Sequence, residues 1–277
     1  TVPGGAAHDG RERDRVVRRG RHLALLAPTL GSAMLVWDLH TPLRFMNMFR
    51  IFKPTSPMSI GTYILTGFSL FSGVIAGAQA VLDRARPGSR AGRMARGVAR
   101  VAQIPAAAAG AGLGTYTAAL LAATSTPLWA ADPAGLAVRF GSSSVAAGAA
   151  ALSLGAGRRL GRRLDEVMLA ALAVELAATL ASHRTYERKG VAPALDSPAG
   201  RAERVGATVL GTMLPIGLLA ASLTARRRLP ALSAAASVAA IAGSATLRIA
   251  FMAAGDESAR RPEVSFRFAQ PDNLPGA

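Results

Sequence analysis

The chain has 277 residues, of which 51% are hydrophobic and 17% charged, and its formal net charge is +16. It contains no cysteine, so it can form neither a disulfide bond nor a thiolate-ligated metal or iron–sulfur site. In a soluble protein this charge would indicate nucleic-acid binding. Here, however, the apolar residues lie in blocks of bilayer length rather than in periodic stripes. The composition therefore predicts a membrane protein that binds no nucleic acid.

Helices cross the hydrocarbon core in about 20 apolar residues, at about 1.5 Å per residue. The sequence predicts an all-α, polytopic transmembrane helix bundle over residues 22–255, between a basic arm (1–21) and a tail (256–277). Seven helices are expected, over 22–39, 60–83, 101–130, 138–157, 164–183, 205–225 and 229–254. Their interiors are rich in small residues, which lets helix backbones approach closely. A GC-rich genome is an alternative source of the same bias.

The basic residues are divided unevenly between the two ends of the predicted helices. If the helices alternate in direction, 19 basic residues fall on the side of the arm and 12 on the other side, with Arg248 inside the last helix. The positive-inside rule places the richer side in the cytoplasm. We therefore expect the connection over 37–61 and the C-terminus to face outward.

The connection over 37–61 mixes charges, prolines and hydroxyls with aromatic residues and methionines. It reads W-D-L-H-T-P-L-R-F-M-N-M-F-R-I-F-K-P-T-S-P-M-S-I-G, which is unusual for a turn after a spanning helix. We interpret it as a buried or interfacial site whose Ser56 and Ser59 cap the next helix. In the alternative interpretation, Asp38 and Arg44 only cap the first helix and the next turn, and Lys53 braces a turn.

A few polar residues stand inside or near the ends of the apolar runs. Glu175 interrupts the fifth run, at an insertion cost of about 3 kcal/mol, and such acids usually face a polar cavity or a proton path. The alternative is a neutral glutamic acid bonded to a neighbouring helix. His183 ends the same run, as a proton relay or as an interfacial histidine. Asp38 and Arg248 both fall in the outer third of their helices, where an ion pair between them is geometrically possible.

Other chemistry has no visible site in the sequence. Among the four histidines, no pair sits mid-helix on facing segments, which argues against haem. H-E-x-x-H, P-loop and G-x-S-x-G motifs are also absent. These observations disfavour catalytic chemistry of the kind found in soluble enzymes.

Several segments together resemble the NrfD/PsrC family, the quinone-interacting membrane subunits of polysulfide, nitrite and related reductases. The main likeness is D-L-x-x-P-x-R-F from Asp38, followed by F-K-P-T-S-P-M-S-x-G from Phe52. Weaker likenesses are Tyr116 and Thr117 followed by Ala118 in place of a glycine, the helix end at 126–129, Glu175, and Arg248 with the segment 254–262. The family fold has eight or more helices, so the resemblance implies that its first helix is missing here.

The resemblance implies roles for these residues. Quinone binding is expected at Asp38, Arg44, Tyr116, Thr117 and Arg248; a proton path at Asp38, Glu175 and His183; and partner docking at Phe52, Lys53, Pro54, Ser56 and Pro57. For Tyr116 the alternative role is a hydrogen-bonded packing residue. The expected cofactor is a quinone, menaquinone or ubiquinone, with no haem or iron–sulfur cluster and no catalytic residue within this chain.

The implied setting is a respiratory complex in a bacterial cytoplasmic (inner) membrane. We predict a membrane anchor and quinone-interacting subunit that passes electrons between quinone and an outward four-cluster ferredoxin-like iron–sulfur subunit, with possible proton translocation. That subunit would be connected to a molybdopterin or other catalytic redox subunit. The alternative is a proton- or ion-translocating or purely structural module without its own quinone site. A solute transporter is disfavoured, because the sequence shows no internal inverted repeat and no paired broken helices.

Overall fold

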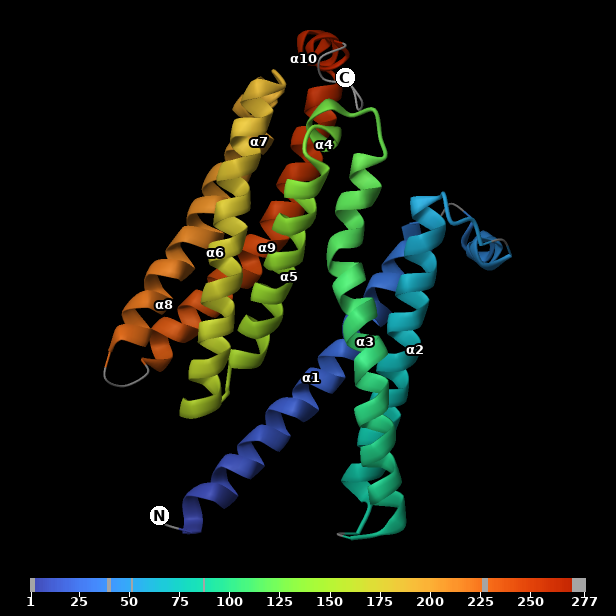
Figure 1. The fold of residues 1–277 in the computed structure, drawn as a ribbon, viewed down its shortest axis with the longest axis vertical. Coiled ribbons are helices and arrows are strands. Elements are labelled where there is room, and N and C mark those ends of the chain that lie inside the picture. The colour runs from blue at the N-terminus through green and yellow to red at the C-terminus, as the bar shows by residue number, and fades with distance from the viewer. Residues whose placement is uncertain (1–2, 39–40, 51, 87, 226–228, 271–277) are drawn as a thin grey trace. The chain divides into compact units, whose positions relative to one another are not determined.

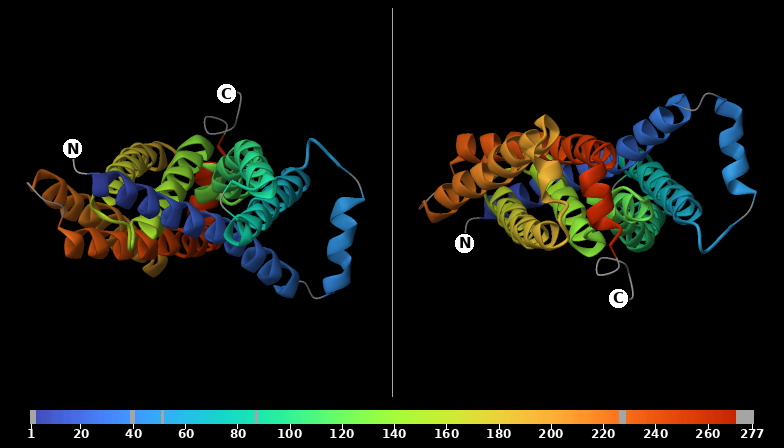
Figure 2. Two further views of the ribbon diagram at one scale, coloured as in Figure 1. Left: turned by 90° about the horizontal axis from the view of Figure 1, so that it is seen from below. Right: turned by 90° about the horizontal axis from the view of Figure 1, so that it is seen from above.

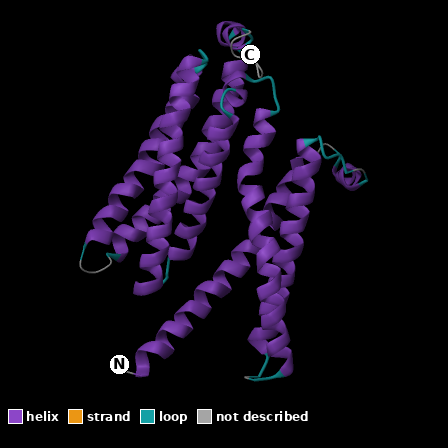
Figure 3. Cartoon of the chain, viewed as in Figure 1, coloured by secondary structure: helices purple, strands orange, loops and turns teal. Residues whose placement is uncertain are grey.

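The computed structural model describes residues 3–38, 41–50, 52–86, 88–225 and 229–270. Within these residues the secondary structure is helical and contains no strand (Figure 3). The chain divides into two compact units, residues 1–113 and 114–277, and each is described by itself. The predicted all-α fold is therefore confirmed.

Unit 1 contains α1 (Pro3–Asp38), the 3-10 helix η1 (Pro42–Phe49), α2 (Pro57–Arg84) and the first part of α3 (Arg90–Ala122). The sequence indicated a basic arm over residues 3–21. These residues are part of helix α1, since Arg, Glu and Ala are strong helix formers. Polar contacts join α1 to α2: Arg18 pairs with Asp83 at 3.2 Å, and Arg21 donates to Gln79 at 2.5 Å.

The short helix η1 lies beside the ends of α1 and α2 (Figure 2), and the Tyr63 hydroxyl of α2 donates a hydrogen bond to the Phe49 carbonyl at 3.4 Å. Ser56 caps α2 by accepting a hydrogen bond from the Ser59 backbone N–H at 3.4 Å, as expected from the sequence. Lower down, α2 and α3 pack through small residues, with Ala78 against Ala95 and Ala99. Small residues at a helix interface are typical of close packing in membranes.

Unit 2 continues α3 and adds the remaining helices (Figure 1). They are α4 (Pro127–Ala130), α5 (Pro133–Ser153), α6 (Arg158–Arg188), η2 (Ala192–Asp196), α7 (Pro198–Ala202), η3 (Glu203–Met213), α8 (Leu214–Thr224), α9 (Pro230–Ala259) and α10 (Pro262–Phe268). Segments α7, η3 and α8 form one continuous helix, in which η3 is a π-helix. The arginines at 226–228 and the tail at 271–277 lie outside the described residues.

The third predicted span, 101–130, is divided into α3 and α4. Helix α3 ends at Ala122, and the Thr124 hydroxyl donates to the Leu121 carbonyl at 2.7 Å. Thr126 has extended backbone angles because the following Pro127 disfavours the helical conformation. Helix α4 then lies on the end of α9: the Trp129 Nε1–H donates to the Phe251 carbonyl at 3.2 Å, and the Leu128 N–H donates to the Ser258 hydroxyl at 3.3 Å.

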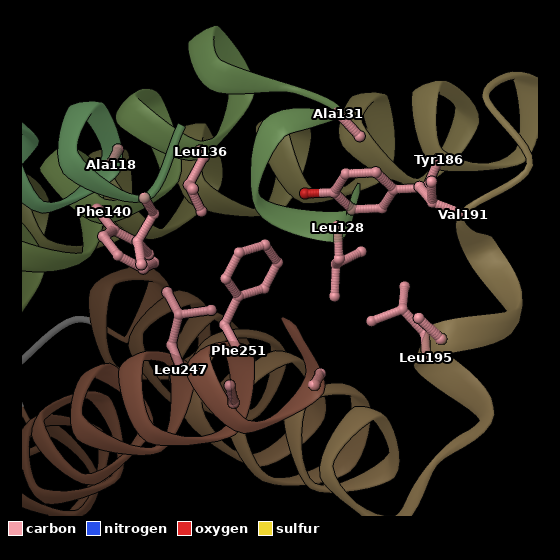
Figure 4. Close-up of a cluster of buried hydrophobic side chains, with 14 of the residues drawn as sticks. Ala118, Leu128, Ala131, Leu136, Phe140, Tyr186, Val191, Leu195, Leu247 and Phe251 are labelled. Carbon is pink, nitrogen blue, oxygen red and sulfur yellow. The ribbon is translucent and has the colours of Figure 1, made fainter. Parts of the chain in front are cut away.

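The largest core of unit 2 lies beneath α4 (Figure 4). Phe140, Phe251 and Leu128 are fully buried there, and the rings of Phe140 and Phe251 meet edge to face, with their centroids 6.2 Å apart. A second cluster, of alanines with Met168, Leu172 and Leu219, occupies the opposite half of the bundle. Both cores draw residues from α5 and α9, so these helices run the length of the buried interior.

Helix η3 and helix α9 approach most closely at a pair of glycines. A Cβ atom placed on Gly211 would lie 2.3 Å from the Gly243 Cα, and one on Gly243 would lie 2.2 Å from the Gly211 Cα. No side chain fits between two backbones at this separation. The contact therefore requires glycine on both helices.

Four stretches of the described residues are long and apolar enough to span a membrane: α2, α3, residues 198–224 and α9. The other predicted spans correspond to α1, α5 and α6. The chain is an integral membrane protein.

Candidate functional site

Glu175 lies near the middle of α6 and is 4% exposed. Its Oε1 accepts a hydrogen bond from the Thr212 hydroxyl of η3 at 3.2 Å. Glu175 also interacts electrostatically with Arg139 of α5 and Arg248 of α9. Because the acid is buried and faces three other helices, it belongs to the bundle interior and not to the lipid-facing surface.

The π-helix η3 brings Thr212 into this position. The Thr212 hydroxyl lies 3.1 Å from the Ala207 carbonyl, five residues earlier, as well as near Glu175. Since it has one hydrogen, it donates to one of these acceptors at a time. The i→i+5 pattern of a π-helix opens the backbone at this turn, and such segments frequently lie at functional sites. Nothing in the apolar pattern of 205–225 indicated this irregularity.

Arg248 forms a network between α9 and α5. One terminal nitrogen donates to the Ser244 hydroxyl at 2.7 Å and to the Ser244 carbonyl at 2.8 Å, and the other donates to the Ser144 hydroxyl at 2.8 Å. The guanidinium carbon lies 5.3 Å from the centroid of the Phe140 ring. These contacts hold a half-buried cation within electrostatic reach of Glu175.

A second cation, Arg139, forms an ion pair with Glu203 at the start of η3. Their side chains are 3% and 4% exposed, and the Arg139 guanidinium carbon lies 5.6 Å from the centroid of the Phe251 ring. Sequence reasoning missed this pair, because it counted Arg139 among loop residues. One signal in the sequence could have indicated the pair. Arg139 and Glu203 stand at the starts of the predicted spans 138–157 and 205–225, and both spans start at the same end of the bundle.

A third buried acid lies near the opposite end of α6. Asp165 is fully buried and accepts hydrogen bonds from the hydroxyls of Ser153 at 2.6 Å and Ser233 at 2.8 Å. Asp165, on α6, thus faces α5 and α9, two of the helices that Glu175 also faces. Sequence reasoning missed Asp165 as well, because it lies close to the arginine-rich start of the helix.

The other expected residues of unit 2 are half-buried. Tyr116 and Thr117 lie on α3 beside Ala118, which is fully buried in the large core. His183 lies on α6, and by helical rise it is about 12 Å from Glu175 along the axis. Within unit 2 the structure thus brings Glu175 and Arg248 together, and His183 stays a separate candidate.

In unit 1, the end of α1 and helix η1 form an open apolar hollow. It is lined by Ser32, Ala33, Val36, Trp37 and Phe45. Asp38 follows Trp37 in the chain and Arg44 precedes Phe45, and both charged residues are exposed. The lining is mainly aliphatic and aromatic, as is usual for sites that bind small molecules. The pairing of Asp38 with Arg248 stays a prediction.

The residues expected to contact a partner form an ordered turn before α2. The Ser59 hydroxyl accepts a hydrogen bond from the Lys53 backbone N–H at 3.1 Å, so the backbone of Lys53 braces the turn. The Phe52 ring packs edge to face on Tyr63, with centroids 4.9 Å apart, yet Phe52 remains 56% exposed. Pro54 is also exposed, whereas Ser56 and Pro57 are half-buried. The turn is therefore both fixed and accessible.

A comparison with known protein families decides the family of the chain. The model described as polysulphide reductase, NrfD, matches residues 6–257. The chain belongs to the NrfD family. No curated protein matches it, and no solved structure does. Membership of the NrfD family indicates a membrane subunit of a redox complex. The resemblance inferred from the 37–61 connection is thereby confirmed.

Proposed function

We propose that this NrfD-family chain exchanges electrons with a quinone on behalf of partner subunits in a bacterial cytoplasmic membrane. The observation that carries the proposal is the family match over residues 6–257, in a bundle that buries Glu175 between Arg139 and Arg248. Conversion between quinone and quinol moves as many protons as electrons. A quinone-reacting subunit therefore needs buried acid–base groups as well as a hydrophobic binding surface.

Two parts of the chain supply these requirements. The hollow lined by Trp37 and Phe45 offers an apolar surface for the ring, and Asp38 and Arg44 are the chain neighbours of these two residues. We assign the quinone headgroup to Asp38, Arg44, Tyr116, Thr117 and Arg248. Protons would be exchanged through Asp38, Glu175 and His183. Menaquinone and ubiquinone both fit this chemistry.

We assign the partner surface to the turn before α2, formed by Phe52, Lys53, Pro54, Ser56 and Pro57. An exposed aromatic ring on a backbone held by its own hydrogen bonds is typical of a protein contact. The proposed partner is a four-cluster ferredoxin-like iron–sulfur subunit, which would be connected to a molybdopterin or other catalytic redox subunit. This surface and the C-terminus would face outward.

A second candidate is a proton- or ion-translocating module without its own quinone site. It is favoured by one observation: the buried charges of Glu175, Arg139 and Glu203 and the half-buried Arg248 all lie in unit 2, whereas the apolar hollow lies in unit 1. Such a module would need only unit 2 for its chemistry. Bound quinone in the purified protein would discriminate between the two candidates.

The experiment is purification of the tagged chain from its native membrane, followed by identification of bound proteins and lipid-extracted quinone. We expect an iron–sulfur protein and a quinone to co-purify. Arg248→Gln should lower quinone-linked electron transfer at least about tenfold, since it removes a fixed donor. The matched control is Arg260→Gln, at the exposed end of the same helix, which should leave the rate unchanged.

Two results would contradict the proposal. One is a chain that purifies alone, without quinone, and moves a solute into liposomes. The other concerns the proton path: if Glu175→Gln left quinone-coupled activity and proton translocation at wild-type levels, Glu175 would not be a relay.

A further inference from the structure

Three buried polar atoms around the Arg139–Glu203 ion pair have no hydrogen-bond partner among the described residues. They are the Arg139 Nε, the Ser182 hydroxyl and the Tyr186 hydroxyl. Ser182 is 0% and Tyr186 1% exposed. A buried polar group without a partner costs about 1–3 kcal/mol. An alanine at 182 and a phenylalanine at 186 would avoid this cost, so the two hydroxyls require an explanation.

Both hydroxyls lie on the same face of α6 as Glu175. Glu175, Thr179, Ser182 and Tyr186 follow the helical spacing i, i+4, i+7 and i+11, which places them in one row. The row rises about 16 Å from Glu175. Figure 4 shows the Tyr186 side chain extending into the core, with its hydroxyl pointing into the cluster and not away from it. The row thus leads from the central acid toward the end of the bundle that holds α4.

The row meets α5 where that helix carries Arg139. A Cβ atom placed on Gly135 would lie 2.4 Å from the Ser182 hydroxyl oxygen, so this hydroxyl lies against the α5 backbone. Gly135 and Arg139 are one turn apart on the same helix and share a face. Tyr186, from the next turn of α6, interacts electrostatically with Arg139. The two hydroxyls therefore lie beside the ion pair, on the α6 row that starts at Glu175.

Charged groups from three other helices lie around this row. Arg139 interacts with Glu203, which belongs to η3. It also interacts with Glu175 and Tyr186, which belong to α6. Glu175 in turn faces Arg248 from α9. Tyr186 also interacts with Asp132, which precedes α5. Arginine stays protonated in proteins, so Arg139 can stabilise either carboxylate but cannot itself pass a proton.

We propose that the hydroxyls of Ser182 and Tyr186, with buried water, carry protons between Glu175 and Glu203, and that Arg139 pairs with whichever carboxylate is deprotonated. Buried water generally satisfies such groups and completes hydrogen-bonded chains. This inference rests on the proposed function and deepens it, because it adds a second protonation site to the path from Glu175.

The transfer conserves protons and charge. Glu175 gives up its proton to the chain, and each hydroxyl or water releases one proton as it receives another. The Glu203 carboxylate takes the last proton. Arg139 then pairs with the Glu175 carboxylate in place of Glu203, and the reverse transfer restores the first state. No electron moves in these steps.

The experiment removes the hydroxyls and leaves the charges in place. The complex is reconstituted in liposomes with Ser182→Ala, Tyr186→Phe or both, and protons translocated are measured per electron transferred to quinone. The matched control is Ser72→Ala in unit 1, whose buried hydroxyl also lacks a partner among the described residues. We expect the double variant to lose more than half of the proton-to-electron ratio, and the control to keep it.

Thermal stability separates this role from a structural one. The melting temperature of each variant is measured beside its proton ratio. A variant that melts at the wild-type temperature and still loses its proton ratio has not lost it by unfolding. If the double variant kept the wild-type ratio, the inference would fail while the proposed function stood. If wild-type complex transferred no electrons to quinone, both would fail. Separate measurement of the single variants keeps the test decisive should one of them not fold.

Discussion

Substitution of Gly211 by alanine tests the packing on which the buried charges depend. Gly211 lies in η3 opposite Gly243 of α9, and a Cβ atom there would lie 2.3 Å from the Gly243 Cα. Contacts between such carbons are normally about 3.5–4.0 Å. The two backbones would have to separate by more than about 1 Å to admit the methyl group.

This separation weakens the whole interface between the two helices. A radial gap of about 0.5–1 Å already forfeits a quarter to a half of each dispersion contact. Overpacking of this kind costs about 1–3 kcal/mol in the free energy of unfolding. The next residue is Thr212, which donates to Glu175, so the displacement should also lengthen that hydrogen bond.

The assay is unfolding of the purified subunit in detergent by a chemical denaturant. The matched control is Gly217→Ala in α8 of the same continuous helix, where a Cβ atom meets nothing within 4 Å. The control should be stabilised by about 0.5–1 kcal/mol, because alanine restricts the unfolded chain more than glycine does. Equal effects of the two substitutions would refute the close approach of η3 and α9.

Two further predictions concern the buried polar contacts. Thr212→Val should lower the unfolding free energy by about 1–3 kcal/mol because the Glu175 carboxyl loses its donor. The control Thr208→Val, one turn earlier on η3, should lower it less. A larger loss for Thr208→Val would contradict the assigned contact. Arg139→Met should cost about 3–5 kcal/mol by leaving Glu203 buried without its cation. Adding Glu203→Met should restore most of that loss in a double-mutant cycle, whereas additive costs would show that the two residues are not paired.

The sequence predicted the features that depend on local or compositional signals. Apolar run length indicated the helices, and Ser56 before Pro57 indicated the cap of α2. Glu175 could be recognised as a buried acid because one charge stood inside a long apolar run. For these features, each residue and its immediate neighbours carry the physical cause.

Features that depend on contacts between distant helices could not be predicted in the same way. Arg139 and Glu203 are 64 residues apart, and the residues around each in the sequence do not indicate which residue it pairs with. The apolar pattern of η3 does not distinguish a π-helix from an α-helix, and the contacts of Thr212 with α6 and of Gly211 with α9 are between segments distant in the chain. The roles of Asp38, Arg44 and Tyr116 stay predictions for a related reason, since they depend on a bound molecule as well as on the fold.

The glycine contact between η3 and α9 also has a consequence for the surrounding lipid. Gly211 precedes Thr212, so the tightest crossing of the bundle lies at the level of Glu175. Helices accommodate a thinner or thicker bilayer by changing their tilt. Tilting about a fixed crossing moves the helix ends most and the crossing least. The geometry around Glu175 should therefore stay nearly constant when the acyl chains of the membrane lengthen or shorten with growth temperature.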